Sequence, residues 1–360
     1  MKDEKRVLIA ASGSGGHLFP AQFVAKALRR QFPDVSIAFV GSGRPLEEKL
    51  IDNEGFKRIV LPLEALRKRN PFTFPFDLLR AFFATWKLFS EFKPDIIIGV
   101  GGYVSFFPVL IARLKSIPSI IHEAEIFAGK ANRILAFFAT KITLAFEETR
   151  IPCRAKAVHT GHPLREELCD FPMPKPLTSR GAYKLLIIGG SQGAKGLDEA
   201  MSALGSFLRS KGMRVLHQSR QENIAILEKS YLESSIDFQV VSFIDDMRKA
   251  YDWADIIISR SGAGAVMELG VVGKPCILVP FPFSQGNHQK TNAMVLVRQG
   301  KAILCEEGEN FPERLREAIS KLLEPKFYET MLLASCDKRS VNAANDIARL
   351  AMSLAENRSE

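Results

Sequence analysis

A histidine, His17, ends a glycine-rich segment that directly follows an apolar run near the start of the chain. Glycines let the backbone approach a phosphate or a sugar closely. The helix expected from Pro20 to Gln31 offers free N–H groups and the positive end of its dipole. An imidazole with a pKa of about 6.5 can accept a proton at neutral pH. The segment therefore predicts a histidine base beside a bound phosphate or sugar, and a tight strand-to-helix turn without a ligand is the less favoured alternative.

Two further glycine-rich segments follow apolar runs. Residues 99–105, GVGGYVS, would form another flexible wall at the same edge of a sheet, and a plain packing loop explains them equally well. Residues 189–194, GGSQGA, place glycines and Ser191 at a helix start, which suits a diphosphate. This segment is neither a Walker A loop nor a strict GxGxxG, which argues against a nicotinamide or flavin cofactor. We expect no cofactor.

Acidic residues accompany a second histidine. His122, Glu123 and Glu125 follow another apolar run, with Gly129 and Asn132 shortly after them. A histidine with two acids at a strand end can orient a substrate or tune a base. A buried, hydrogen-bonded structural pair of His122 and Glu123 is the slightly favoured alternative.

The densest polar segment runs from Phe243 to Asn292. Within it, Glu268 stands on an expected helix that enters a nucleotide pocket, where a carboxylate can accept two ribose hydroxyls. Gln289 and Asn292 share a helical face, and their amides suit sugar hydroxyls. Any one of these residues alone is an ordinary surface group. The set is more specific, because it lies at strand ends of an α/β sheet, where ligands bind.

Short β-branched runs alternate with helical patterns along the chain, which predicts parallel sheets with helices on both faces. The runs of the first half lie at 7–12, 36–42, 56–62, 95–102 and 119–123. A second series lies at 183–193, 214–219, 238–243, 255–262 and 276–283. Two copies of one pattern predict an α/β fold with two Rossmann-like domains that face each other across a cleft.

The join between the two series, 151–182, is rich in proline and polar residues, as linkers are. We expect an N-terminal domain of residues 1–162 that is completed by residues 338–360. The C-terminal domain would comprise residues 163–337. The expected last helix, 341–356, has one apolar face with which it could pack back on the first domain.

The chain has 360 residues, of which 46% are hydrophobic and 25% charged, and its formal net charge is +9. The excess of Lys and Arg favours anionic partners. Because no zinc-finger, RNP-type or helix-turn-helix signature occurs, we expect no nucleic-acid partner. The five cysteines form no C-x-x-C pair, which argues against a metal site or a disulfide framework and fits a reducing compartment. We expect neither a signal peptide nor a transmembrane helix.

An aromatic and basic segment spans residues 66–92. It mixes Arg67, Lys68, Arg69, Arg80 and Lys87 with Phe72, Phe74, Phe76, Phe82, Phe83, Trp86 and Phe89. Such a mixture suits an anionic membrane surface. Aromatic residues that fill the core of the first domain are an equally good interpretation.

Together these segments closely resemble the MurG family of glycosyltransferases (glycosyltransferase family 28) over nearly the whole chain and in the right order. The matching segments are GSGGHLFPA, GVGGYVS, HE…AGKAN, GHPLR, GGSQGAKGLDEA, the stretch from FIDDM to CILVPFPF, and HQKTNA. The resemblance implies a GT-B fold and an inverting transfer, without a metal, of N-acetylglucosamine from UDP-N-acetylglucosamine. The acceptor would be the C4 hydroxyl of N-acetylmuramoyl-pentapeptide on undecaprenyl diphosphate (lipid I), and the product would be lipid II.

The resemblance also implies where the chain acts. It would be peripheral, at the cytoplasmic face of the bacterial inner membrane, in peptidoglycan synthesis and hence in cell shape and cell division. The N-terminal domain would serve the acceptor and the anionic membrane surface, and the C-terminal domain would bind the UDP-sugar. Other cell-wall synthesis proteins are further expected partners.

The family's motifs imply roles for individual residues. His17 matches the proposed base, and we expect Glu123 or Glu125 to assist it. The implied substrate contacts are Ser14, Gly15, Gly16, Glu125, Arg165, Ser191, Ile244, Ala263, Gly264, Ala265, Val266, Met267, Glu268, Gln289 and Asn292. Among these, Glu268 would hold the ribose and Ile244 would meet the uracil through its backbone.

Five positions depart from the family's pattern. Ser14 stands for threonine, Glu125 and His162 each stand for asparagine, and Phe106-Phe107 stands for a Gly-Pro pair. The change at Glu125 adds negative charge near a diphosphate, which puts that donor contact in doubt. The pair at 106–107 would alter the wall on the acceptor side.

Three alternatives remain. A related transferase that glycosylates diacylglycerol is disfavoured by the GGSQGA and HE…AGKAN segments. A UDP-sugar epimerase also has two Rossmann-like domains but needs no acceptor. A non-catalytic nucleotide-binding module is disfavoured because His17, Glu268 and Gln289 all occur.

Overall fold

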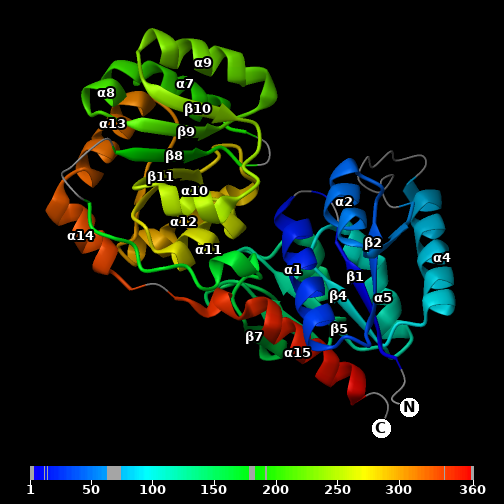
Figure 1. Ribbon diagram of the computed structural model, residues 1–360. Helices are drawn as coiled ribbons and strands as arrows, with labels where there is room; N and C mark the ends of the chain where they lie inside the picture. The colour runs from blue at the N-terminus through cyan, green and yellow to red at the C-terminus, as the bar shows by residue number, and fades with distance from the viewer. Residues whose placement is uncertain are drawn as a thin grey trace. The chain divides into compact units, whose positions relative to one another are not determined.

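The computed structural model describes residues 4–11, 13, 15–62, 74–177, 183–190, 193–335 and 337–357. The chain divides into two compact α/β units (Figure 1). Unit 1 comprises Met1–Glu166 and Arg339–Glu360, and unit 2 comprises Glu167–Lys338. The predicted fold class is confirmed, because each unit contains a parallel sheet covered by helices.

Unit 1 contains, in its described part, a seven-stranded parallel sheet of order β3-β2-β1-β4-β5-β6-β7. Its strands are β1 (Arg6–Ala10), β2 (Ser36–Gly41), β3 (Lys57–Val60), β4 (Ile96–Gly99), β5 (Ser119–Glu123), β6 (Lys141–Leu144) and β7 (Ala157–His159). The interior strand β1 pairs with β2 and β4, so that Val7 lies between Ile37 and Ile96. All the loops after these strands therefore emerge at one carboxyl edge.

Successive side chains of β1 point to opposite faces of the sheet, because strand side chains alternate. Val7 and Ile9 pack in one core with α1 (Gly15–Gln31) and α15 (Ala343–Glu356), which lie side by side (Figure 1). Leu8 and Ala10 pack in a second core on the other face. That core is covered by α4 (Phe74–Phe92), α5 (Phe106–Leu114) and α6 (Lys130–Leu135). The short helix α2 (Pro45–Leu50) adds Leu50 to the first core.

Unit 2 contains, among its described residues, a six-stranded parallel sheet of order β10-β9-β8-β11-β12-β13. Its strands are β8 (Lys184–Ile188), β9 (Arg214–Gln218), β10 (Asp237–Val241), β11 (Ile256–Arg260), β12 (Cys276–Val279) and β13 (Ala302–Leu304). The flanking helices are α7 (Lys195–Ala203), α8 (Gly205–Ser210), α9 (Ile224–Glu233), α10 (Met247–Trp253), α11 (Ala263–Val272), α12 (His288–Arg298), α13 (Phe311–Leu322) and α14 (Pro325–Leu333).

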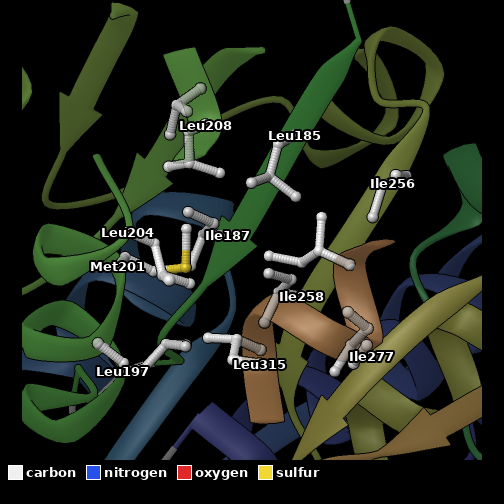
Figure 2. Close-up of a cluster of buried hydrophobic side chains, with 14 of the residues drawn as sticks. Leu185, Ile187, Leu197, Met201, Leu204, Leu208, Ile256, Ile258, Ile277 and Leu315 are labelled. Atoms are coloured by element: carbon white, nitrogen blue, oxygen red, sulfur yellow. The ribbon is translucent and has the colours of Figure 1, made fainter. Parts of the chain in front are cut away.

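Figure 2 shows the main core of unit 2. Leu185 and Ile187 of β8 pack with residues of β11 and β12 against leucines and a methionine from α7, α8 and α13. The helices α10, α11 and α12 cover the other face of this sheet (Figure 1). Helices α10 and α11 follow β10 and β11, and their chain segments carry several of the predicted donor contacts.

The structure corrects two local predictions. Helix α1 begins at Gly15 rather than at Pro20, so that Gly15, Gly16 and His17 form its first turn. The strands β6, β7 and β13 were not predicted. The last helix does pack on the first unit, against α1.

Candidate functional site

In unit 1, the imidazole of His17 lies between two of the predicted glycine segments. A methyl group placed on Gly101 would be 3.1 Å from Nε2 of His17, and one placed on Gly13 would be 3.7 Å from Nδ1. Gly101 has a φ of +85°, which favours glycine. The hydroxyl of Ser105 lies 2.8 Å from the carbonyl oxygen of Gly101 and 3.0 Å from that of Ala10, which anchors this loop to β1. The two glycine segments therefore form the walls around one imidazole.

The carboxylate of Glu123 organises the loop that follows β5. It accepts hydrogen bonds from the backbone N–H groups of Glu125 (2.9 Å) and Gly129 (3.0 Å) and from the side-chain amide of Asn132 (2.9 Å). Burial raises the pKa of Glu123 to about 7, although these three donors oppose the shift. Asn132 also lies within 3.9 Å of the methyl position on Gly101 that His17 contacts. Glu123 thus reaches the surroundings of His17 through Asn132.

Two buried histidines, His122 and His162, are joined by a hydrogen bond. Nε2 of His122 lies 3.1 Å from Nδ1 of His162, and Nδ1 of His122 lies 3.1 Å from the hydroxyl of Thr143. Burial lowers the pKa of His162 to about 3 and that of His122 well below its ordinary value, and the nearby His17 adds to both shifts. Both rings are therefore neutral hydrogen-bonding groups at neutral pH. The two side chains do not pair with each other as the sequence alternative had it; instead the side-chain amide of Asn132 donates both to the backbone carbonyl of His122 and to the carboxylate of Glu123, at 2.9 Å each.

The remaining predicted residues of unit 1 are placed as follows. Gly15 is buried and Gly16 exposed in the first turn of α1, and Glu125 is half-buried. Arg165 belongs to unit 1, where its guanidinium stands 5.7 Å from the ring centre of Phe19 on α1. Ser14 lies outside the described residues.

In unit 2, Gln218 at the end of β9 holds the loop after β8. Its side-chain oxygen accepts from the N–H of Gly190 at 3.0 Å, and its amide donates to the carbonyl of Gly190 at 3.2 Å and to that of Ser242 at 3.1 Å. The predicted GGSQGA loop is thereby tied to the loop before Ile244. Ser191 lies outside the described residues. Sequence reasoning missed Gln218, because its partners are distant in the chain.

The loop after β11 leads into α11 at Ala263, as predicted. The first N–H groups of a helix have no intrahelical acceptor, and no acidic side chain stands in the first turn of α11. Gly264, Ala265 and Met267 are half-buried, whereas Ala263 and Val266 are buried. This helix start offers backbone donors to an anion.

Glu268 follows on the same helix and is half-buried. One of its carboxylate oxygens accepts a hydrogen bond of 2.9 Å from the hydroxyl of Tyr251 on α10. Ile244 lies half-buried in the loop between β10 and α10. The structure therefore connects Ile244 and Glu268 through one short helix.

The predicted amides on α12 differ in exposure. Gln289 is half-buried, and its side-chain oxygen accepts from the N–H of Phe281 at 2.9 Å. Asn292 is fully buried. Gln289 is therefore the more accessible of the two amides.

A buried arginine that the sequence analysis did not assign ends β11. The guanidinium of Arg260 pairs with Glu307 at 2.5 Å and donates to the carbonyls of Val279 and Pro280. The carboxylate of Glu307 in turn fills the space above Gly196 in the first turn of α7, where a methyl group would lie 2.6 Å from it. These contacts join the ends of β11, β12 and β13 to the start of α7.

Helix α4 presents one buried face and one exposed apolar face. Ala81, Thr85, Leu88 and Phe89 are buried, whereas Phe76 and Phe83 are 74% and 64% exposed. Leu79 and Trp86 continue this exposed face at helical spacing, and we call Phe76, Leu79, Phe83 and Trp86 the α4 ridge. Of the basic residues predicted here, Arg67, Lys68 and Arg69 lie outside the described residues, as does Phe72. None of the described helices has the length and apolar character needed to span a bilayer.

Both units match models of one protein family. Residues 7–144 match the glycosyltransferase family 28 N-terminal domain, and residues 184–349 match the glycosyltransferase family 28 C-terminal domain. A relative from Coxiella burnetii is 39% identical over 308 residues, which are 84% of this chain and 85% of the relative. The chain belongs to glycosyltransferase family 28.

The names of individual relatives within family 28 indicate a particular kind of transferase. The Coxiella protein is named UDP-N-acetylglucosamine--N-acetylmuramyl-(pentapeptide) pyrophosphoryl-undecaprenol N-acetylglucosamine transferase. The crystal structure of Acinetobacter baumannii MurG matches with a TM-score of 0.80 and 29% identity, covering 97% of this chain and 99% of that one. The predicted family and glycosyltransferase class are confirmed.

An epimerase shares the fold with this family 28 chain. The UDP-GlcNAc 2-epimerase from Neisseria meningitidis matches with a TM-score of 0.67 and 14% identity, covering 97% of this chain and 99% of that one. At this identity the likeness shows the fold alone.

Proposed function

We propose that this chain transfers N-acetylglucosamine from UDP-N-acetylglucosamine to the C4 hydroxyl of N-acetylmuramic acid in lipid I and so makes lipid II. Two observations together support the proposal. A relative that covers 84% of the chain is named as this transferase, and the structure holds a histidine, His17, between two glycine-rich loops. The reaction belongs to peptidoglycan synthesis, and its loss would impair cell shape and division.

His17 is the proposed base. It takes the proton from the acceptor hydroxyl as that oxygen bonds to the anomeric carbon of the donor sugar, and the bond from this carbon to the UDP oxygen breaks. The configuration at the carbon inverts in this single displacement. Glu123 supports the base by holding the loop of Glu125 and the amide of Asn132.

Unit 2 binds the donor in this proposal. Glu268 accepts the ribose hydroxyls, the backbone at Ile244 meets the uracil, and Gln289 contacts the sugar. The N–H groups from Ala263 to Ala265 and the hydroxyl of Ser191, all in unit 2, stabilise the charge on the leaving diphosphate, and Arg165 of unit 1 is a further proposed donor contact. Such preorganised donors contribute about 3–4 kcal/mol each to the transition state, and the proposal includes no metal ion.

One substitution tests the proposal directly. Purified protein and a His17→Ala variant are incubated with UDP-N-acetylglucosamine and a short-chain lipid I analogue, and sugar transfer is followed by mass spectrometry. We expect transfer by the wild type and a loss of turnover of roughly 100-fold or more in His17→Ala, with UDP still bound. Near-normal turnover of the variant would rule out the base assignment. Release of a free epimer of the donor sugar without acceptor would support the epimerase alternative, and transfer only to diacylglycerol the related lipid transferase.

The membrane partner follows from the α4 ridge. Its exposed aromatics lie beside Arg80, Lys87 and Lys115, and the ammonium of Lys115 stands 4.0 Å from the ring centre of Trp86. An apolar face rimmed by cations suits the surface of an anionic bilayer. We propose that this membrane is the inner membrane and that the chain lies at its cytoplasmic face, where other cell-wall synthesis proteins would meet it.

A further inference from the structure

We infer that Tyr251 is a positioning residue for the nucleotide ribose, which acts by fixing the carboxylate of Glu268. The inference rests on the proposed role of Glu268 as the acceptor for the ribose hydroxyls. Tyr251 does not touch the ribose itself in this scheme. It determines how the carboxylate that does so is oriented.

The hydrogen bond from Tyr251 to Glu268 is shielded from solvent and has a charged acceptor. The side chain of Tyr251 is 1% exposed, so its hydroxyl cannot turn to bulk solvent for a partner. It lies 2.9 Å from Oε2 of Glu268, and a bond to a charged acceptor is stronger than one between neutral groups. A carboxylate oxygen accepts more than one hydrogen bond. Glu268 can therefore keep Tyr251 and still receive hydroxyls from a ligand.

The backbone of Tyr251 is anchored as firmly as its side chain. The ammonium of Lys274 donates to the carbonyl oxygens of Tyr251 (2.7 Å), Asp252 (2.9 Å) and Ala254 (2.5 Å), and so caps the end of α10. Lys274 is itself buried and directly follows Gly273, the residue that ends α11. Helix α10 is thus held to α11 at two points, by Lys274 and by the Tyr251 hydroxyl.

The other end of α10 is fixed as well. The carboxylate of Asp246 accepts from the N–H of Lys249 at 2.9 Å and caps the helix start. Asp246 is two residues after Ile244 in the chain. The loop proposed to contact the uracil therefore leads directly into α10, and the same helix carries the Tyr251 hydroxyl that orients the proposed ribose acceptor. Helix α10 thus positions the groups proposed for both parts of the nucleoside.

Ribose selectivity provides the test, because a merely structural tyrosine would not affect it. Affinities for UDP and for 2′,3′-dideoxy-UDP are measured by calorimetry on wild type, Tyr251→Phe, Glu268→Ala, the double variant and a matched control, Tyr328→Phe. Tyr328 is 2% exposed, and its hydroxyl donates to the carbonyl of Asp255 at 2.9 Å, so the control removes an equally buried hydroxyl in the same unit. Thermal melting of each variant reports its folding cost.

We expect Tyr251→Phe to weaken UDP roughly 5- to 10-fold and to leave 2′,3′-dideoxy-UDP unchanged. Tyr328→Phe should bind both nucleotides as the wild type does. In a Glu268→Ala background, Tyr251→Phe should cause no further loss, since the two residues act through one interaction. In turnover, Tyr251→Phe should raise KM for the donor and change kcat less than about twofold.

The outcomes separate the inference from the proposed function. If Glu268→Ala keeps the full preference for UDP over the dideoxy nucleotide, the proposed ribose role of Glu268 is wrong. If Glu268→Ala loses that preference but Tyr251→Phe keeps it, or weakens both nucleotides equally, the inference about Tyr251 alone is overturned. Should Tyr251→Phe not fold, Glu268→Asp withdraws the carboxylate from the tyrosine while keeping its charge. Retention of full ribose selectivity by Glu268→Asp would also overturn the inference.

Discussion

His17 and Gly101 are in such close contact that the imidazole occupies the space of a side chain at position 101. A methyl group on Gly101 would lie 3.0 Å from Cδ2 and 3.1 Å from Nε2 of the ring. The glycine is therefore needed twice, for its φ of +85° and for the room it leaves. The position of the proposed base depends on a residue that carries no functional group.

Gly101→Ala should displace the imidazole of His17 by a few tenths of an ångström, because the new methyl group would stand 3.0–3.1 Å from the ring. We expect kcat/KM to fall roughly tenfold, since misplacing a reacting group by about 1 Å can lower the rate about 100-fold. UDP affinity should be little changed, because Gly101 is not among the proposed donor contacts. Gly55→Ala is the matched control: Gly55 also has a positive φ, of +73°, but no atom within 4 Å of a new methyl group. Equal losses in both variants would mean that backbone strain, not the contact with His17, is responsible.

His162→Asn should make unit 1 less sensitive to acid. The pKa of His162 is lowered to about 3 from 6.5, mainly by burial, so below pH 6.5 the unfolded imidazole takes up a proton that the folded one does not. Stability therefore falls as pH falls, and at pH 5 about 2 kcal/mol of it is lost through this residue. Asparagine does not titrate and can still donate to His122.

Urea unfolding at pH 7 and pH 5 checks this expectation. The chain contains two tryptophans, Trp86 in unit 1 and Trp253 in unit 2, so a Trp253→Phe background makes the fluorescence report unit 1 alone. The difference in stability between the two pH values should shrink by about 2 kcal/mol in His162→Asn. An unchanged difference would contradict the assignment of the proton uptake to His162.

For Glu123 the stability of unit 1 should depend on pH in the opposite direction, so Glu123→Gln should remove a loss of stability that occurs as the pH rises. Burial raises the pKa of Glu123 from 4.5 to about 7, so the folded state binds more protons than the unfolded state between these values. Below pH 4.5 the protonated side chain contributes fully to the free energy of unfolding. As the pH rises towards 7, about 3 kcal/mol of this contribution is lost. Relative to the wild type, the variant should gain stability by this order between pH 4.5 and pH 7 in the same Trp86 assay. A constant difference between the two proteins would show that Glu123 keeps one protonation state.

Replacing Phe76 and Phe83 of the α4 ridge by serine should weaken membrane binding at least about tenfold, because each phenyl ring loses a favourable transfer out of water. Co-sedimentation with phosphatidylcholine vesicles, with and without phosphatidylglycerol, measures the effect. The control replaces Ile226 and Leu232 of unit 2 by serine, two side chains that are each 67% exposed. Binding that ignores the anionic lipid, or equal losses in both variants, would count against the ridge as the membrane contact.

Much of the fold could be predicted because its central strands are long and apolar. Runs such as VLIA at 7–10 and IIIS at 256–259 are buried on both faces of a parallel sheet, and each is followed by glycines. The start of α1 was misplaced because Pro20 suggested a first helical position, whereas it lies inside the helix. Proline is tolerated at a helix start, and sequence alone gives no sign that the five residues ahead of it already belong to the helix.

Site residues that stand within one sequence motif could be predicted, whereas contacts between residues far apart in the chain could not. His17 and Glu268 each stand in a recognisable segment. The bond between His122 and His162 spans 40 positions, and the clamp of Gln218 on Gly190 spans 28. Such pairs arise only when the sheet order brings separate strand ends together, and no local pattern encodes that order.

The return of α15 to unit 1 has a consequence for biosynthesis. Ile347, Ala348 and Ala351 of this helix belong to the core that β1 and α1 begin. The ribosome therefore completes every residue of unit 2 before it releases the segment that closes unit 1. Unit 1 is translated first, but its core is completed last. A premature stop codon near the 3′ end of the mRNA would therefore leave incomplete the core of unit 1, the unit that contains His17.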